Sequence, residues 1–206
     1  MLKDLQSVKH IIINPLIKPD TQRDAVNIRT QIPEGHNHCK NTSCTMALNW
    51  VGQHYAGSPG VNSNVATLSN MGEYQYNSIL LIPGFMQADE KIQSWQPQIK
   101  AINQMLVNGN VPLNAHYVKF RQNYDRIIYS LLSGRPVVLG TWITQDGHIV
   151  LLVGMTQNGD FIIIDPYGDP LSGYKIKTAD YYIIPSAQFT QWVREDCSCI
   201  YFSERT

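Results

Sequence analysis

The sequence has no excess of charge of either sign. It contains 16 basic and 16 acidic residues among 206, so its formal net charge at pH 7 is zero. A protein that neutralises a string of phosphates needs clustered lysine and arginine, and this sequence has no such run. We therefore expect no nucleic-acid partner.

Long apolar runs are also missing. A run such as residues 79–83 is far shorter than the stretch of about 20 residues that crosses a bilayer. The first residues, MLKDLQ, lack the apolar core of a signal peptide. We expect a chain that does not span a membrane, has no signal peptide and is made as a soluble cytoplasmic protein. Association with a virion, or release from the cell, is the alternative for its final location.

Cysteine is scarce. Four cysteines do not make a disulfide framework in a chain of this size, so nothing in the sequence points to an oxidising compartment. A metal site is the alternative use of these thiols, but the spacings match no usual zinc pattern. We expect neither a metal nor another cofactor. The residues weighed for a metal site are His36, His38, Cys39, Cys197 and Cys199.

The length suits one domain with a full hydrophobic core, and no internal repeat divides the chain. We expect a single domain over residues 1–206, in which residues 1–28 form a non-helical lead-in. Within the lead-in, residues 8–17 have the β-branched composition of a strand, and Pro15 places that strand at an edge.

The most informative stretch is a helix start at Cys39. The apolar residues that follow it recur at helical spacing, and they are Cys44, Ala47, Leu48, Val51 and Tyr55. Cys39 precedes this stripe, at a helix N-terminus whose free N–H groups and dipole favour a thiolate. Cys44 lies within the stripe, where a thiol is a small inert hydrophobe. Cys39 is therefore the candidate nucleophile, and the alternative is that both cysteines only pack.

Two further helices are predicted in the middle of the chain. Residues 98–106 and 124–132 carry apolar side chains at helical spacing. Between the first helix and these two, the Gly/Pro-containing residues 57–60 end a helix, and the Asn/Ser-rich residues 62–70 are typical of a loop.

From Arg135 onwards the pattern changes to short β-rich runs. Residues 136–142, 148–155 and 161–165 are predicted strands, and the Asn158-Gly159 turn makes the last two a hairpin. Further along the chain the prediction is a strand at 181–184, a short helix at 186–193 and a strand at 199–202. A helical half followed by an antiparallel sheet defines the α+β class.

Two polar residues mark neighbouring ends of this hairpin. His148 begins the first strand, where we expect it to be exposed and not needed for packing, and Asp165 ends the second. Antiparallel pairing would place them side by side, so that the carboxylate accepts from one imidazole nitrogen while the other faces a thiol. Taken separately, each residue is better explained as a surface histidine or a turn former.

Four segments together resemble the papain-like cysteine peptidases related to the bacteriocin-processing, double-glycine-leader peptidases. They are CKNTSCTMAL at 39–48, SGRPVV at 133–138, GHIVLLVG at 147–154 and DPYG at 165–168. The resemblance covers roughly residues 29–195, in the family's order of Cys, His and Asp. It implies a papain-like fold, in which an N-terminal helical part carries the nucleophile and packs on a C-terminal antiparallel sheet.

The resemblance also implies roles for individual residues. Cys39 would be the nucleophile, His148 the group that takes and returns the proton, and Asp165 the group that orients His148. Such enzymes place a glutamine upstream of the nucleophile as an oxyanion-hole donor, a role that falls to Gln31, with Gln22 as the competitor.

Lys40 departs from the family, since many relatives carry Asn or Gly after the nucleophile. A cation there opposes the helix dipole but favours a neighbouring thiolate. The four tryptophans are scattered, so we expect them in the core or in a cleft wall. They are Trp50, Trp95, Trp142 and Trp192.

The sequence thus predicts a cysteine peptidase that hydrolyses a peptide or amide bond through a Cys-His-Asp triad and an acyl-enzyme. The expected partner is a peptide or protein substrate. Two alternatives stay open: a bacterial or phage-borne hydrolase of cell-wall peptides, and a catalytically silent module that serves for binding or as part of a larger assembly.

Overall fold

A computed structural model describes residues 10–12, 16–22, 38–80 and 94–206 of the chain. Its helices are α3 (Cys39–Tyr55), α4 (Glu73–Leu80), α5 (Trp95–Asn108), α6 (Tyr124–Leu132) and α7 (Ser186–Trp192), with short 3-10 helices η2 (Ser63–Asn70) and η3 (Arg121–Asn123). Its strands are β1 (His10–Ile12), β2 (Leu113–Lys119), β3 (Val137–Thr141), β4 (His148–Thr156), β5 (Phe161–Ile164), β6 (Tyr181–Ile184) and β7 (Ser198–Glu204).

The strands form one sheet in which neighbouring strands are antiparallel. Their order is β2-β7-β3-β4-β5-β6, and β1 pairs with the last residues of β4, beyond the part of β4 that pairs with β3. The predicted α+β class is confirmed, with the N-terminal helices preceding most of the sheet. The strand predicted in the lead-in is present as β1, and it pairs with β4 alone among the described strands.

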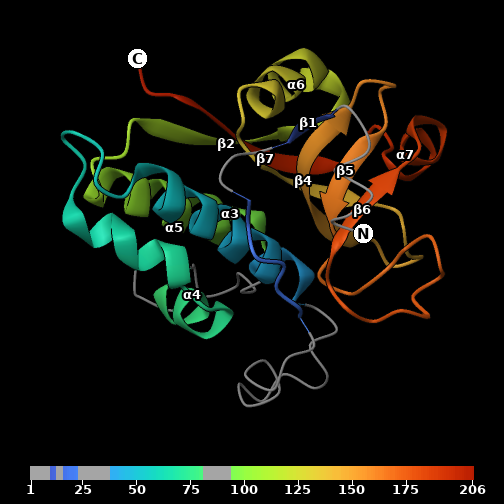
Figure 1. The fold of residues 1–206 in the computed structure, drawn as a ribbon, viewed down its shortest axis with the longest axis horizontal. Helices are drawn as coiled ribbons and strands as arrows, with labels where there is room; N and C mark the ends of the chain where they lie inside the picture. Colours follow the sequence, from blue (N-terminus) through green and yellow to red (C-terminus); the bar gives the residue numbers. More distant parts are fainter. Residues whose placement is uncertain (1–9, 13–15, 23–37, 81–93) are drawn as a thin grey trace.

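Helices cover both faces of the sheet (Figure 1). On one face α3 lies against the strands, with α4 packed on α3 and α5 packed mainly on β2, and this layer shares a core with Val138, Leu151 and Ile200 of the sheet. On the other face α6 and α7 pack against the alternate side chains of the same strands, including Leu139 and Leu152. Among the described residues, no helix is long and apolar enough to cross a membrane.

Helix α3 is buried between the sheet on one side and η2 and α4 on the other. It begins at Cys39 as predicted, and the stripe residues from Cys44 to Val51 are fully buried. Polar residues on its other sides are buried too, and Thr42 and Thr45 satisfy their hydroxyls by bonding back to the carbonyls of His38 and Asn41. The sequence predicts one buried stripe, but more of the helix surface is buried because other elements pack on it from two sides.

The segment predicted as a loop at 62–70 is instead mostly the 3-10 helix η2. It lies directly on α3. The Asn49 amide donates to the carbonyls of Leu68 and Met71, both at 2.9 Å. At the point of contact α3 has Gly52, where a Cβ atom would lie 2.2 Å from the backbone nitrogen of Ser69. Only a residue without a side chain allows this approach.

Strand β2 was not predicted from the sequence, and it forms one edge of the sheet beside β7. The outward-facing backbone groups of Ala115 are satisfied by one side chain of α5. Asn103 accepts from the Ala115 N–H at 2.9 Å and donates to the Ala115 carbonyl at 3.0 Å. In the middle of this edge strand, the Asn103 amide therefore makes the two hydrogen bonds that a neighbouring strand would make.

The predicted hairpin of β4 and β5 is confirmed. Gly159 has φ +85°, a left-handed conformation that the tight turn requires, and the turn is closed by the Thr156 N–H donating to the Asp160 carbonyl at 2.9 Å. Since β4 begins at His148 and β5 ends at Ile164, the hairpin brings His148 to the same edge as the residue that follows β5.

Candidate active site

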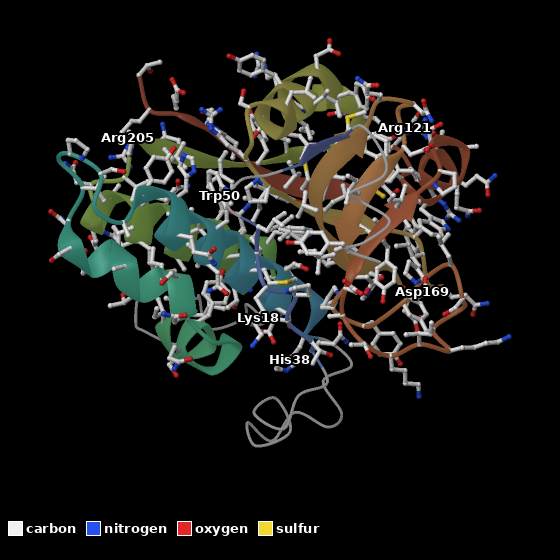
Figure 2. The ribbon with its side chains drawn as sticks, in the orientation of Figure 1. Lys18, His38, Trp50, Arg121, Asp169 and Arg205 are labelled. Atoms are coloured by element: carbon white, nitrogen blue, oxygen red, sulfur yellow. The ribbon has the colours of Figure 1, made fainter. Side chains whose placement is uncertain are left out.

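Three predicted site residues meet where α3 faces the end of the hairpin. Cys39 is the first residue of α3, and Figure 2 labels the residue before it, His38, at the start of this helix. His148 is the first residue of β4, and Asp165 directly follows β5. The Cys39 thiol and the Asp165 carboxylate are both close enough to the His148 ring to raise its pKa.

Asp165 is completely buried and is held by three donors. Its Oδ1 atom accepts from His148 Nε2 at 2.7 Å and from the backbone N–H of Tyr167 at 2.8 Å. Its Oδ2 atom accepts from the hydroxyl of Tyr174 at 3.1 Å. A buried carboxylate needs such partners, because burial without them is costly. Since Nε2 of His148 is bound to Asp165, Nδ1 is the ring nitrogen left for Cys39.

His148 is buried, with 7% of its surface exposed, so the expected exposure at the strand end is wrong. The reason is that the rings of Tyr167 and Tyr174 stand edge-on to the imidazole, each with its centroid 6.1 Å away. Burial alone would lower the pKa of His148, but the Asp165 carboxylate and the Cys39 thiol outweigh it and raise this pKa to about 10. The surroundings thus favour the imidazolium form.

Cys39, His148 and Tyr167 line a cleft of about 820 Å³. Gln22 also lines it and is 1% exposed. The Gln22 backbone N–H donates to the carbonyl of Pro166 at 3.1 Å, which ties this part of the lead-in to the residue after Asp165. Gln31, the preferred oxyanion-hole donor from the sequence, lies outside the described residues.

Lys40 and two tryptophans contribute to the cleft walls. The Lys40 ammonium lies 4.2 Å from the ring centroid of Trp95, in a cation–π contact. Burial lowers the pKa of Lys40, while the nearby thiols Cys44 and Cys39 act in the opposite direction. Trp142 also lines the cleft, and its indole N–H donates to Asp196 at 3.1 Å.

The other two tryptophans do not reach the cleft. Trp50 lies in the core between α3 and the sheet (Figure 2). Trp192 is partly buried and packs against the core on the other face of the sheet, which α6 and α7 cover. The interpretation of the four tryptophans as core or cleft wall is confirmed.

The other three cysteines are buried free thiols, whereas Cys39 is partly exposed. Burial raises the pKa of Cys44 and of Cys199 to about 12, and it also raises the pKa of Cys197. Cys197 nevertheless lines the cleft, a position that the sequence did not reveal. The residues around Cys197 give no sequence signal of a site, because this part of the chain reaches the cleft only through the pairing of β7 with β3.

A cysteine at the start of a buried helix, facing a histidine and a carboxylate on an antiparallel sheet, is the arrangement of papain-like cysteine peptidases. This class combines an N-terminal helical part with a C-terminal antiparallel sheet, as observed here. The chain belongs to the Peptidase_C39 like family, whose model matches residues 21–193. That family is one of cysteine peptidases. No curated protein matches the chain.

Proposed function

We propose that the chain is a cysteine peptidase that hydrolyses peptide bonds through Cys39, His148 and Asp165. The observation that carries the proposal is the 2.7 Å bond between the fully buried Asp165 and His148, which lines the same cleft as Cys39. It leaves one imidazole nitrogen for the thiol and fixes the direction of the ring.

In the proposed reaction the Cys39 thiolate attacks the carbonyl carbon of the scissile peptide, and the carbonyl electrons move to oxygen. When the tetrahedral intermediate collapses, the C–N bond breaks and the leaving amine takes the proton of the His148 imidazolium. Neutral His148 then removes a proton from water, which attacks the thioester. When this second tetrahedral intermediate collapses, the C–S bond breaks, the acid product leaves, and the Cys39 thiolate is restored beside the protonated His148.

The developing oxyanion needs donors, and we assign them to the backbone N–H of Cys39 and the side-chain amide of Gln22. The support for Gln22 over Gln31 is its place in the cleft with Cys39 and His148, and its anchoring to Pro166. Gln31 stays the competitor that mutagenesis must separate from it.

The substrate we propose is a peptide or protein, processed as in the bacteriocin-leader type of peptidase. The support is the sequence resemblance of the four segments around Cys39, Arg135, His148 and Asp165. Hydrolysis of cell-wall peptides, and a silent binding module, are the outcomes against which this substrate class is tested.

The decisive experiment compares variants on a peptide library, with purified cell wall offered separately. Cys39→Ala and His148→Ala should each abolish cleavage, while Cys44→Ala, which removes a thiol from the core, should keep it. Gln22→Ala should lower turnover about 10²-fold, as expected for a lost oxyanion donor, and Gln31→Ala should not.

Circular dichroism of each variant should show the folded secondary structure of the parent, which separates lost chemistry from lost fold. His148→Ala should melt below the parent, because it leaves the buried Asp165 carboxylate without this partner. Equal turnover in the parent and Cys39→Ala would refute the mechanism. Cleavage of cell wall alone would move the substrate to the wall peptide. Failure to cleave either substrate, with Cys39 unreactive towards thiol reagents, would favour the silent module.

A further inference from the structure

Tyr174 stands out in the loop between β5 and β6 because of its backbone. It has φ +62°, and only one other non-glycine residue of the described part, Asn110, has a positive φ. A bulky side chain in the left-handed region is strained, and such strain persists only where the surroundings fix it.

Hydrogen bonds within the loop hold Tyr174 in this conformation. Its N–H donates to the carbonyl of Asp169 at 2.9 Å, and the Asp169 N–H donates to the carbonyl of Ile176, also at 2.9 Å. Asp169 is labelled in Figure 2, in the loop beyond β5. Gly168 allows this closure, since a Cβ atom there would lie 2.3 Å from the Ile176 carbonyl oxygen. The loop is thus built to present one side chain.

That side chain reaches the carboxylate behind the histidine. The Tyr174 hydroxyl donates to Asp165 Oδ2 at 3.1 Å, and its ring lies edge-on to His148 and, at 4.9 Å between centroids, to Tyr167. The Tyr174 hydroxyl therefore binds the Asp165 oxygen that His148 does not bind. The ring fills space beside the imidazole that water would otherwise enter.

We infer that Tyr174 is a positioning residue of the active site, which fixes the rotation of the Asp165 carboxylate so that Oδ1 faces His148 Nε2, and which shields this pair from water. The inference rests on the proposed function, because it assumes that the direction and charge of His148 matter for the reaction. Tyr174 acts through Asp165 and does not contact the reacting atoms.

The hydroxyl stays a donor over the range in which the site works. Burial and the neighbouring Asp165 carboxylate raise the pKa of Tyr174 well above its usual range. The titratable groups that act on His148 itself are Asp165, which follows β5, and Cys39 of α3. A change in the titration of His148 can therefore be traced to a small set of groups.

The test is the rate at which iodoacetate alkylates Cys39, followed by mass spectrometry from about pH 5 to about pH 11. This reagent is an anion, so the His148 imidazolium attracts it and the rate falls where the imidazolium loses its proton. Tyr174→Phe should move this alkaline fall to lower pH by about half a unit or more, since a carboxylate free to rotate holds the imidazolium less firmly.

Two comparisons make the result specific. Asp165→Ala should cause a larger shift, and adding Tyr174→Phe to it should cause none, because residues that act through one group are not additive. Asp165→Asn replaces Asp165→Ala in this cycle if the alanine variant does not fold. The matched control is Tyr182→Phe, which removes a hydroxyl that donates to the carbonyl of Thr178 at 2.6 Å, and it should leave the profile unchanged.

The outcomes separate the positioning role of Tyr174 from the proposed function of the site. A parent-like profile for Tyr174→Phe, or an equal shift in Tyr182→Phe, would overturn the positioning role while leaving the Cys39–His148 pair in place. A parent-like profile for His148→Ala would overturn the proposed function itself. A shift that persists unchanged in the Asp165→Ala background would show that Tyr174 does not act through Asp165.

Discussion

Replacing Gly52 with alanine sets two effects of opposite sign against each other. In an exposed helix, alanine is more stable than glycine by about 1 kcal/mol. In α3 the new Cβ would lie 2.2 Å from the Ser69 nitrogen and 2.7 Å from the Leu68 carbonyl carbon, which are backbone atoms that cannot rotate away. The 3-10 helix η2 would have to move outwards.

The structure indicates how large the cost is. Overpacking of a tight contact costs about 1–3 kcal/mol. Moving η2 also strains the two 2.9 Å bonds from Asn49 to Leu68 and Met71, and a hydrogen bond contributes about 1 kcal/mol. After the gain in helix propensity is subtracted, we expect Gly52→Ala to lower the free energy of unfolding by about 2–4 kcal/mol.

For a chain of this size each kcal/mol shifts the melting temperature by about 2–4 °C, so the expected fall is about 5–15 °C. Thermal unfolding followed by circular dichroism measures it directly. The matched control is Gln53→Ala on the exposed face of the same helix, which should stay within about 0.5 kcal/mol of the parent. A Gly52→Ala variant as stable as the parent would show that α3 and η2 do not approach each other as described.

Three further predictions concern the thiols and the histidine. Iodoacetamide at neutral pH should modify Cys39 well before the buried thiols Cys44, Cys197 and Cys199. Mass spectrometry of the folded protein measures the order of labelling, and earlier labelling of a buried thiol would contradict the site. Turnover should survive a strong chelator and require only a reducing agent, and loss of turnover together with stoichiometric zinc would contradict the thiol mechanism. In a Cys39→Ala background, we expect Asp165 alone to keep the pKa of His148 above the unfolded value of about 6.5, so that the stability contributed by His148 is complete below that pH and is lost as pH rises through the folded pKa. Urea unfolding should show this decline in Cys39→Ala and a shallower one after further replacement by His148→Gln.

The elements that the sequence predicts well are those whose signal is local. The stripe after Cys39 gives the start of α3, and the Asn158-Gly159 turn between two β-rich runs gives the hairpin that brings His148 beside Asp165. Apolar spacing also finds most of α5 and all of α6. In each case the residues that determine the structure lie within one element or one turn.

The features that the sequence does not predict depend on distant partners. Strand β2 alternates apolar and polar side chains only over residues 113–117, and it is fixed by pairing with β7, far along the chain. Tyr174 lies in a polar loop, and only the folded loop shows that its hydroxyl reaches Asp165. The burial of His148 has the same origin, because the rings that cover it come from two positions after β5.

The amide of Asn103 has a consequence for how the molecule meets others of its kind. An edge strand with free N–H and C=O groups invites a strand from another chain to add to the sheet. Since Asn103 occupies both outward groups of Ala115, a foreign strand could pair with β2 only by first displacing this side chain from the centre of the edge. Asn103→Leu would remove that barrier, and fibril-binding dyes or light scattering on heating would then reveal intermolecular sheet growth that starts from β2.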